Sequence, residues 1–316
     1  MTDYRPRLSI VVPLFNSAST VAKLIAELSA VCAQADGEIV LVNDGSRDET
    51  ERAARETIRN STVPITLISH SRNFGEHNAV LTGLRAAKGD FVVTMDDDLQ
   101  NPPSEVMKLV NAAESAQRDV VYSAYAQKEH SWWRNSGSAV TNLIADFVVD
   151  KPRKLYLSSF RCMSRLVAQE VAKSRNPHPY IDGLIFQVTQ NVGVVQVEHV
   201  PRGQGASGYT LHKLIRLWIS MLINVSVVPL RLMTFAGLIA SALGFVALIE
   251  VVLERLVHRT PTGWGSLMAA VLLLSGTQLV LLGILGEYVG RIYLGINEKP
   301  QSVVRHVFHN GESDAR

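Results

Sequence analysis

The first half of the chain alternates continuous apolar runs with stretches in which apolar residues recur every three or four positions. Because their apolar side chains would share one helical face, the latter stretches predict helices. Strands that alternate with helices at this pitch form βαβ units around a parallel sheet. We therefore expect an α/β domain over residues 1–208. The apolar runs predict five strands, at residues 8–12, 39–42, 65–68, 91–95 and 120–125.

Two longer apolar runs follow in the second half of the chain. Residues 232–249 and 265–286 contain no charged side chain. Each run is long enough to cross a bilayer, which takes roughly 20 apolar residues. We expect two transmembrane helices, at about 231–253 and 265–288. The alternative is a pair of buried core helices, but charge-free runs of this length are rare in soluble domains.

Basic residues are distributed unevenly around these two runs. Two of them, Arg255 and Arg259, lie in the link between the runs, and six lie on the side of the chain termini. This asymmetry places both termini in the cytosol. The apolar face of residues 209–228 predicts an amphipathic helix at the membrane surface. The hairpin then occupies residues 229–292, and residues 293–316 form a cytosolic tail. The six basic residues are Lys213, Arg216, Arg231, Arg291, Lys299 and Arg305.

Composition excludes several classes of protein. Hydrophobic residues make up 47% of the 316 residues and charged residues 19%, which excludes a disordered chain. The net charge is only +2, so we expect no general attraction to nucleic acid. The chain contains two cysteines, far apart in sequence, which excludes a disulfide scaffold and favours reduced thiols.

Three polar loops follow the predicted strand ends, at Phe15–Ser17, Asn43–Ser46 and Asp96–Asp98. In parallel sheets, ligands bind outside the carboxyl ends of the strands. We therefore expect these three loops to line one crevice.

The third loop has the most specific composition, because residues 95–103 read MDDDLQNPP. On an extended backbone Asp96 and Asp98 point the same way, and Asp97 points elsewhere. Carboxylate oxygens suit Mg²⁺ or Mn²⁺, and such ions commonly bind substrate phosphates as well. The alternative is a solvated acidic turn that caps the following helix.

The motifs in these loops resemble those of family-2 glycosyltransferases of the GT-A fold. With the two apolar runs, the chain resembles the polyprenyl-phosphate glycosyltransferases, a group that includes dolichol-phosphate mannose synthase and bacterial undecaprenyl-phosphate sugar transferases. The resemblance covers nearly the whole chain. The motifs are VVPLFN at 11–16, VNDGS at 42–46, RNFG at 72–75, DDDLQNPP at 96–103 and GEYVGRIY at 286–293.

The resemblance implies a nucleotide-sugar site and a metal. Asp96 and Asp98 are implied as the catalytic residues and, with Gln100, as ligands of Mg²⁺ or Mn²⁺ on the donor diphosphate. The family usually has Tyr and Glu in its first motif, where this chain has Phe15 and Ser17. The residues implied in binding the nucleotide-sugar are Pro13, Phe15, Asn16, Asp44, Asn73, Gly75 and Asp97.

The resemblance also implies a site for the acceptor phosphate. Its cations come from a loop that carries Trp132 and Trp133, which we expect to anchor at the membrane interface, and from a Gly-rich loop at 202–207. A further arginine of the family is replaced by Tyr125. The residues implied are Lys128, Arg134, Ser138, Arg202 and Ser207.

Other titratable residues have two interpretations. Asp182 lies where many GT-A enzymes keep a catalytic acid, but a helix N-cap is the alternative interpretation. His70, His77, His178 and His212 show no metal-ligand spacing, and we expect them at the surface or at helix caps.

The expected function is transfer of a sugar from a nucleotide-sugar of UDP or GDP type to a polyprenyl phosphate such as undecaprenyl phosphate. The product would serve cell-envelope biosynthesis, and the enzyme would be a multi-pass protein of the bacterial inner membrane. The resemblance implies a homo-oligomer, a tetramer. The alternatives are a processive polysaccharide synthase, whose Gln-x-x-Arg-Trp motif is absent, a subunit of a sugar-lipid transporter, and a catalytically inactive nucleotide-binding scaffold.

Overall fold

The computed structural model describes residues 5–125, 157–177, 179–198, 200, 263–296 and 300–310, with scattered positions between 235 and 253. The chain divides into two compact units. The first contains Met1–Leu214 together with Pro300–Arg316, and the second contains Ile215–Lys299.

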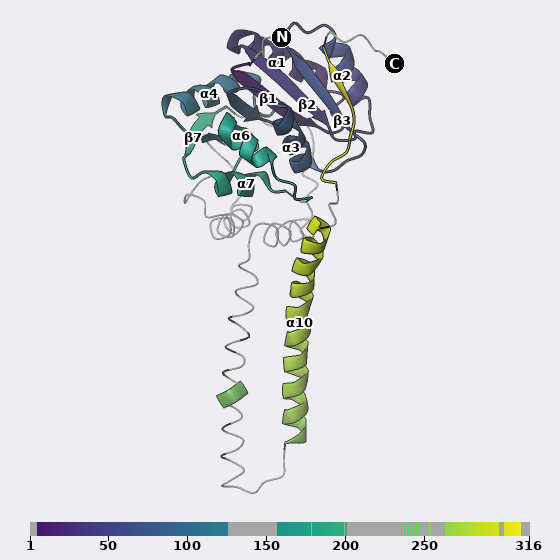
Figure 1. Ribbon diagram of the computed structural model, residues 1–316, viewed down its shortest axis with the longest axis vertical. Coiled ribbons are helices and arrows are strands. Elements are labelled where there is room, and N and C mark those ends of the chain that lie inside the picture. Colours follow the sequence, from purple (N-terminus) through teal and green to yellow (C-terminus); the bar gives the residue numbers. More distant parts are fainter. Residues whose placement is uncertain are drawn as a thin grey trace. The chain divides into compact units, whose positions relative to one another are not determined.

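The described residues of the first unit form an eight-stranded sheet (Figure 1). Its strand order is β7-β5-β6-β4-β1-β2-β3-β8, and four of the strand pairs are parallel: β1 with β2, β1 with β4, β2 with β3 and β5 with β7. The prediction of an α/β fold with a mostly parallel sheet is therefore confirmed. The strands are β1 (Leu8–Leu14), β2 (Gly37–Asn43), β3 (Ile65–His70), β4 (Phe91–Thr94), β5 (Val120–Tyr125), β6 (Arg161–Ser164), β7 (Val192–Val197) and β8 (Val304–His309).

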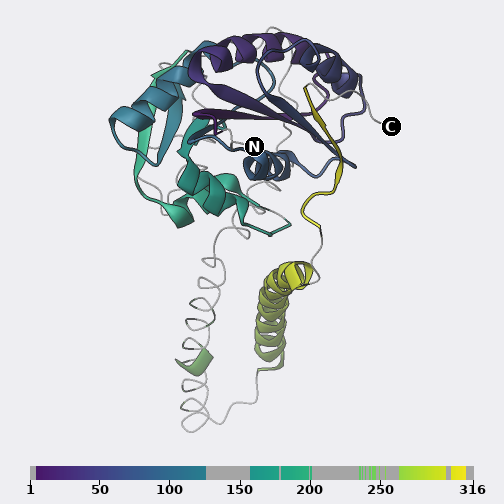
Figure 2. The ribbon, with the colours of Figure 1, turned by 45° about the horizontal axis from the view of Figure 1, so that its top comes forward.

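Helices cover both faces of this sheet (Figure 2). One face packs against α1 (Val21–Ala35), α2 (Thr50–Ile58) and α4 (Val106–Ser115), which follows a short 3-10 helix at Pro103–Glu105. The other face packs against α3 (Glu76–Ala86), α6 (Arg165–Ala172) and α7 (Ile181–Val188). Ile10 and Val12 of β1 belong to the first core and Val11 to the second. Burial on both faces explains the continuous apolar runs in the sequence.

The four-residue strand β6 was not predicted. It lies between β4 and β5 and runs antiparallel to both. Thr94 of β4 pairs with Arg161 of β6, so β6 begins at the edge of the sheet where β4 ends. The residues that precede β6 are thereby placed beside the acidic loop at 96–98.

The predicted cytosolic tail contributes a strand to the sheet. Strand β8 pairs antiparallel with β3, with Phe308 opposite Leu67. Just before β8, the Ser71 N–H donates to the Val303 carbonyl over 2.9 Å. Residues 300–310 therefore belong to the first unit, and the chain enters and leaves the second unit from the same domain.

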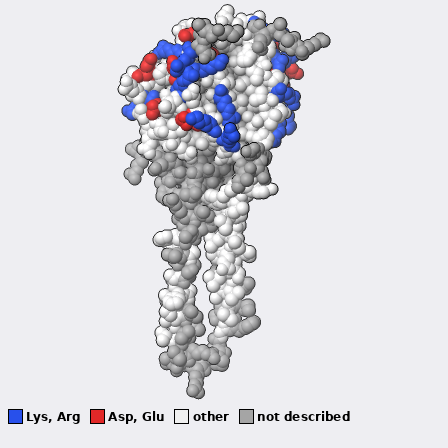
Figure 3. Space-filling model, viewed as in Figure 1, with Lys and Arg blue, Asp and Glu red and all other residues white. Residues whose placement is uncertain are grey.

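The second unit contains α10 (Trp264–Ile296), and the residues described between 235 and 253 are helical. Its described side chains are uncharged, and in the face shown in Figure 3 the coloured lysine, arginine, aspartate and glutamate residues lie on the first unit. Within the described residues, no helix combines the length and the apolar character needed to cross a membrane. The predicted amphipathic helix at 209–228 lies outside the described residues.

Candidate active site

A pocket of about 300 Å³ opens at the carboxyl ends of β1, β2 and β4. The three polar loops meet there as expected from a parallel sheet. The residue that the sequence analysis missed is Glu76, at the start of α3. The lining residues are Pro13, Leu14, Phe15, Asp44, Asn73, Glu76, Asp96, Asp97 and Asp98.

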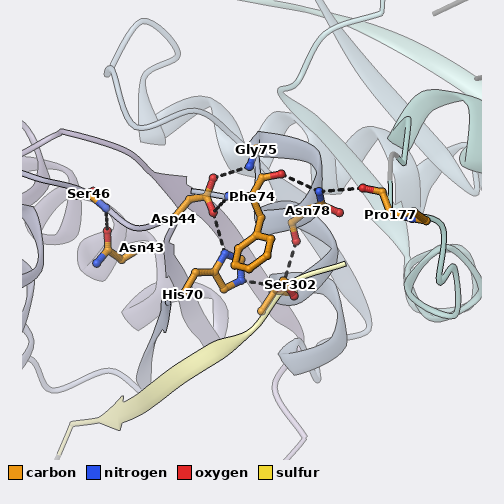
Figure 4. Close-up of polar contacts among 10 residues, drawn as sticks. Asn43, Asp44, Ser46, His70, Phe74, Gly75, Asn78, Pro177 and Ser302 are labelled. Carbon is orange, nitrogen blue, oxygen red and sulfur yellow. Dashed lines mark hydrogen bonds and ion pairs between the residues drawn. The ribbon is translucent and has the colours of Figure 1, made fainter. Parts of the chain in front are cut away.

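Asp44 is the most strongly held carboxylate of the pocket and is 2% exposed. Its Oδ1 accepts hydrogen bonds from His70 Nδ1 at 2.8 Å and from the Phe74 backbone N–H at 2.9 Å (Figure 4). Its Oδ2 accepts from the Gly75 N–H at 2.8 Å. Asp44 therefore fixes the loop that follows β3, in addition to facing the pocket.

The residue after Asp44 must be glycine. Gly45 has φ +63°, and a Cβ atom there would lie 2.4 Å from the carbonyl carbon of Arg72. Side chains other than hydrogen would push the 72–75 loop away from Asp44. The Asn-Asp-Gly-Ser sequence therefore forms a turn and also allows the loop after β2 to pack closely against the 72–75 loop.

The three aspartates after β4 take different partners. Asp96 Oδ2 accepts a hydrogen bond from Ser159 Oγ at 2.6 Å. Asp97 Oδ2 accepts from the Phe15 N–H at 3.0 Å and from the Ser17 hydroxyl. Asp98 Oδ1 accepts from the Gln100 N–H at 3.1 Å. Asp97 therefore holds the loop after β1, and Ser17 stands where a glutamate would bring a second carboxylate against it.

Negative charge accumulates in this pocket. Burial first, and then the charges of Asp96 and Asp98, raise the pKa of Asp97, against the hydrogen bonds from Ser17 and Phe15. Desolvation and the charge of Asp96 likewise raise the pKa of Glu76. Carboxylates that repel each other in a pocket favour a bound cation.

The donor set fits a cation shared with a ligand. Among the described residues, no three His, Cys, Asp or Glu side chains are arranged to hold a metal ion by themselves. Asp96 and Asp98 both line the pocket, and Mg²⁺ is usually held by one or two carboxylates together with substrate phosphates and water. The residues therefore suit a metal–diphosphate complex better than a protein-only metal site.

Asp182 occupies a different environment. Its carboxylate is buried, accepts a hydrogen bond from Tyr122 OH at 2.8 Å and pairs with the buried guanidinium of Arg161. The charge of Asp182 raises the pKa of Arg161 despite the opposing effect of burial. The N-cap interpretation is wrong, because Tyr180 precedes α7 and Asp182 lies within its first turn. Asp182 is not among the pocket-lining residues.

The remaining predicted residues fall into two groups. Asn16 lies beside the pocket with φ +54°, and its Oδ1 accepts from the Arg47 N–H at 2.9 Å, which links the loops after β1 and β2. Gln100 follows the acidic loop. The predicted acceptor residues Lys128, Arg134, Ser138, Arg202 and Ser207 lie outside the described residues, as do His178 and His212.

Two histidines differ from the expectation of surface or capping positions. His70 is 3% exposed and bonds Asp44. His77 is partly buried, its ring meets Tyr180 edge-on, and burial lowers its pKa. The pairing of His70 with Asp44 follows from the sheet. Asn43 of β2 pairs with Ser69 of β3 in parallel register, so the next residues, Asp44 and His70, are neighbours. The only signal in the sequence is that both residues stand at the carboxyl ends of consecutive predicted strands.

An α/β domain with an acidic pocket at the carboxyl edge of its sheet is the architecture of GT-A glycosyltransferases. The structure is similar to glucosyl-3-phosphoglycerate synthase from Mycobacterium tuberculosis in complex with UDP (TM-score 0.51, 19% identity, 69% of this chain and 79% of that chain). It is similar to the same synthase with Mn²⁺, UDP and glucosyl-3-phosphoglycerate (TM-score 0.51, 18% identity, 69% and 79%). These likenesses establish the fold.

Residues 9–171 match glycosyl transferase family 2, and residues 228–292 match the GtrB C-terminal hairpin. The chain belongs to glycosyltransferase family 2, as its motifs predict. It is 31% identical to undecaprenyl-phosphate 4-deoxy-4-formamido-L-arabinose transferase of Edwardsiella ictaluri, over 99% of this chain and 98% of the relative. The enzyme with this name from Serratia proteamaculans is also 31% identical, over 95% and 94%.

Proposed function

We propose that this glycosyltransferase moves a sugar from a nucleotide-sugar to a polyprenyl phosphate such as undecaprenyl phosphate. The observation that carries the proposal is the extent of the similarity to the undecaprenyl-phosphate transferases, which runs through the pocket and the hairpin to 99% of the chain. A likeness confined to the catalytic domain would support only a glycosyltransferase of unspecified acceptor.

The pocket offers groups for each part of a nucleotide-sugar. Phe15, 46% exposed at the rim, presents an aromatic ring on which a base can stack. Asp44 faces the pocket with a carboxylate that accepts N–H groups, as a base would offer. Pro13, Asn16, Asn73, Gly75 and Asp97 shape the loops around them.

Asp96 and Asp98, with Gln100 close by, would hold Mg²⁺ or Mn²⁺ on the donor diphosphate. A divalent cation there would stabilise the negative charge that develops on the leaving nucleoside diphosphate. The chain's own contribution is to fix the carboxylates: Ser159 holds Asp96, and the Gln100 N–H holds Asp98.

The acceptor needs no strong base in this reaction. An oxygen of the lipid phosphate attacks the anomeric carbon, the bond from that carbon to the diphosphate oxygen breaks, and the nucleoside diphosphate leaves. The lipid phosphate is already ionised near neutral pH. This fits the engagement of Asp182 with Arg161 and Tyr122. By resemblance, Lys128, Arg134, Ser138, Arg202 and Ser207 would bind the acceptor phosphate.

We further propose that residues 231–253 and 265–288 form a membrane hairpin, with the catalytic domain and both termini in the cytosol of a bacterium, at its inner membrane. The match of 228–292 to a hairpin family supports this, as do the exposed apolar side chains of α10, such as Leu279, Leu282 and Ile292. Strand β8 returns to the same domain that precedes the hairpin.

Cysteine labelling tests this topology. Burial raises the pKa of the Cys32 thiol to about 12 and raises that of Cys162, so both native thiols should be unreactive. In intact cells, Thr262→Cys should react with an impermeant reagent and Ser313→Cys should not. Labelling of Ser313→Cys from outside would contradict the proposed orientation.

A donor screen tests the proposed reaction. Membranes that contain the chain are incubated with undecaprenyl phosphate and a panel of radiolabelled UDP- and GDP-sugars. We expect one donor class to give a lipid that carries a single sugar. Label in a polymer would favour a processive synthase, and label in no lipid with any donor would reject the proposal.

A further inference from the structure

Asp44 belongs to a closed ring of hydrogen bonds (Figure 4). The Phe74 N–H donates to Asp44, and Asn78 Nδ2 donates to the Phe74 carbonyl at 2.7 Å. Thr82 Oγ1 donates to the Asn78 carbonyl at 3.0 Å. His70 closes the ring, with Nε2 at 3.0 Å from Thr82 Oγ1 and Nδ1 at 2.8 Å from Asp44 Oδ1.

The Asp44 end of the ring shows that Nδ1 of His70 carries a proton. A carboxylate oxygen only accepts hydrogen bonds, so His70 Nδ1 must donate to Asp44. The plane of the His70 imidazole is fixed by a second contact, because it meets the Phe74 side chain edge-on with ring centroids 5.6 Å apart. The His70 side chain is 0% exposed, so water does not compete for the hydrogen bond to Asp44.

The ring extends to the segment that follows the second unit. Ser302 Oγ lies 3.0 Å from Thr82 Oγ1. Its neighbour Gln301 is buried, donates to the Asn176 carbonyl at 2.6 Å and accepts from Arg85. The segment after α10 is thereby fixed to α3, the helix that carries Thr82.

We propose that His70 is a positioning residue for nucleotide recognition, which orients the Asp44 carboxylate toward the donor's base and is itself steadied through Thr82 by Ser302. The inference rests on the proposed nucleotide-sugar site. It makes the docking of residues 301–303 part of the donor site, although these residues do not line the pocket. Affinity for the nucleotide therefore depends on a segment that enters the fold only after the hairpin.

The test measures nucleotide affinity of the full-length protein in detergent by calorimetry, with Mn²⁺ and with UDP and GDP as probes. CDP and ADP serve as comparisons, because their bases lack the ring N–H that uracil and guanine offer to a carboxylate. The variants are His70→Ala, His70→Asn and Ser302→Ala. His309→Ala is the matched control. His309 is an exposed histidine on β8, in the same C-terminal segment as Ser302, and its Nδ1 contacts the Thr66 hydroxyl. Thermal unfolding is recorded for each variant.

His70→Ala should weaken binding of the preferred nucleotide about tenfold, as expected for loss of a hydrogen bond to a charged group. It should also reduce the preference for UDP over CDP, or for GDP over ADP. His70→Asn should recover part of both, because its amide nitrogen can take the place of Nδ1 as the donor to Asp44. Ser302→Ala should weaken binding about two- to threefold, and His309→Ala should not change it.

A lower unfolding temperature for His70→Ala with unchanged affinity and base preference would overturn the inference, as would equal losses in His70→Ala and His70→Asn. If the wild-type protein bound none of the nucleotides, the proposed function itself would be wrong and the inference would fall with it.

Discussion

Strands β1, β2 and β4 end at the edge of the sheet where the pocket lies, whereas β6 begins there. The parallel strands are followed by carboxylates: Asp44 after β2 and the aspartates at 96–98 after β4. The antiparallel strand brings hydrogen-bond donors instead. Ser159, just before β6, donates to Asp96, and Arg161, its first residue, pairs with Asp182.

The difference assigns separate tasks to the two parts of the sheet. The carboxylates of the parallel part line the pocket, where a ligand would contact them. The donors at the start of β6 contact carboxylates of the protein, and their role is to hold them. A change at Asp98 should therefore affect the reaction more than the fold, and a change at Arg161 should do the reverse.

The largest effect is expected for Asp98→Ala, which removes a pocket carboxylate of the parallel part. The rate of transfer should fall by about a thousandfold, the size seen when a group that stabilises transition-state charge is removed. The free energy of unfolding should stay within about 1 kcal/mol, since Asp98 is only partly buried and lines the pocket. Initial rates measure the transfer and urea unfolding measures the stability, with Glu56→Ala, at an exposed side chain, as the control.

Chelation of the metal by EDTA should reduce the transfer rate of the wild-type protein as much as Asp98→Ala does, and added Mg²⁺ or Mn²⁺ should restore it. Full turnover in the presence of the chelator would contradict the proposed metal dependence.

Arg161→Met tests the structural task of β6. It leaves the Asp182 carboxylate buried without its cation, which should lower the free energy of unfolding by about 3–5 kcal/mol. The control is Arg165→Met, because Arg165 is partly exposed and its Nη1 lies 3.9 Å from Asp90 Oδ1. Such an exposed ion pair contributes less than about 1 kcal/mol to stability. The double variant Arg161→Met with Asp182→Leu should recover much of the loss. Similar small losses for Arg161→Met and Arg165→Met in urea unfolding would contradict this reading of the buried pair.

Ser159→Ala should have an intermediate effect on the reaction. Asp96 loses a donor at 2.6 Å, and loss of a hydrogen bond to a charged group should lower kcat/KM about tenfold. Ser29→Ala, at a partly buried hydroxyl 3.4 Å from Ser61 Oγ and away from the pocket, is the control for steady-state kinetics. An unchanged kcat/KM would show that Asp96 does not depend on β6.

The smallest effect is expected for Glu76→Gln, measured by urea unfolding as a function of pH. The pKa of Glu76 is raised in the folded protein, so the folded state binds the proton more tightly than the unfolded state. That stabilisation is present below the ordinary pKa of a glutamate and is lost as the pH rises through the raised value. Neighbouring groups partly desolvate the Glu76 carboxyl, but the residue remains exposed to solvent. Solvent screening therefore reduces the effect, and the variant should gain only about 0.5 kcal/mol over wild type at pH 8 and less at pH 4. A gain that grew toward acid pH would contradict the direction of the shift.

The sequence predicted strands β1 to β5 well, for a physical reason, whereas β7, which pairs parallel with β5, was not predicted. Strands buried on both faces appear as continuous apolar runs, and their carboxyl ends share one edge, so the meeting of Phe15, Asp44 and Asp96 in one pocket followed from the runs alone. Strand β6 has only four residues, two of them Arg161 and Ser164, and gives no such run.

What could not be predicted depends on pairing between distant segments. The valines of β8 have exposed side chains, and its partner β3 lies in the first third of the chain, so no local pattern reveals the pair. His70 was missed because its spacing to other histidines was considered, whereas its partner Asp44 directly follows the neighbouring strand β2. The N-cap interpretation of Asp182 was wrong, and its partner could not be foreseen because the cation that neutralises it, Arg161, lies on the unpredicted β6.

Photo-crosslinking tests most directly whether the nucleotide binds at the carboxyl ends of the parallel strands. The full-length protein is irradiated with 5-azido-UDP or 8-azido-GDP in the presence of Mn²⁺, with and without excess UDP or GDP, and the labelled peptides are sequenced. We expect label that the free nucleotide suppresses, in peptides that contain Pro13–Asn16 or Arg72–Gly75. Suppressible label confined to peptides outside the loops that line the pocket would contradict this expectation.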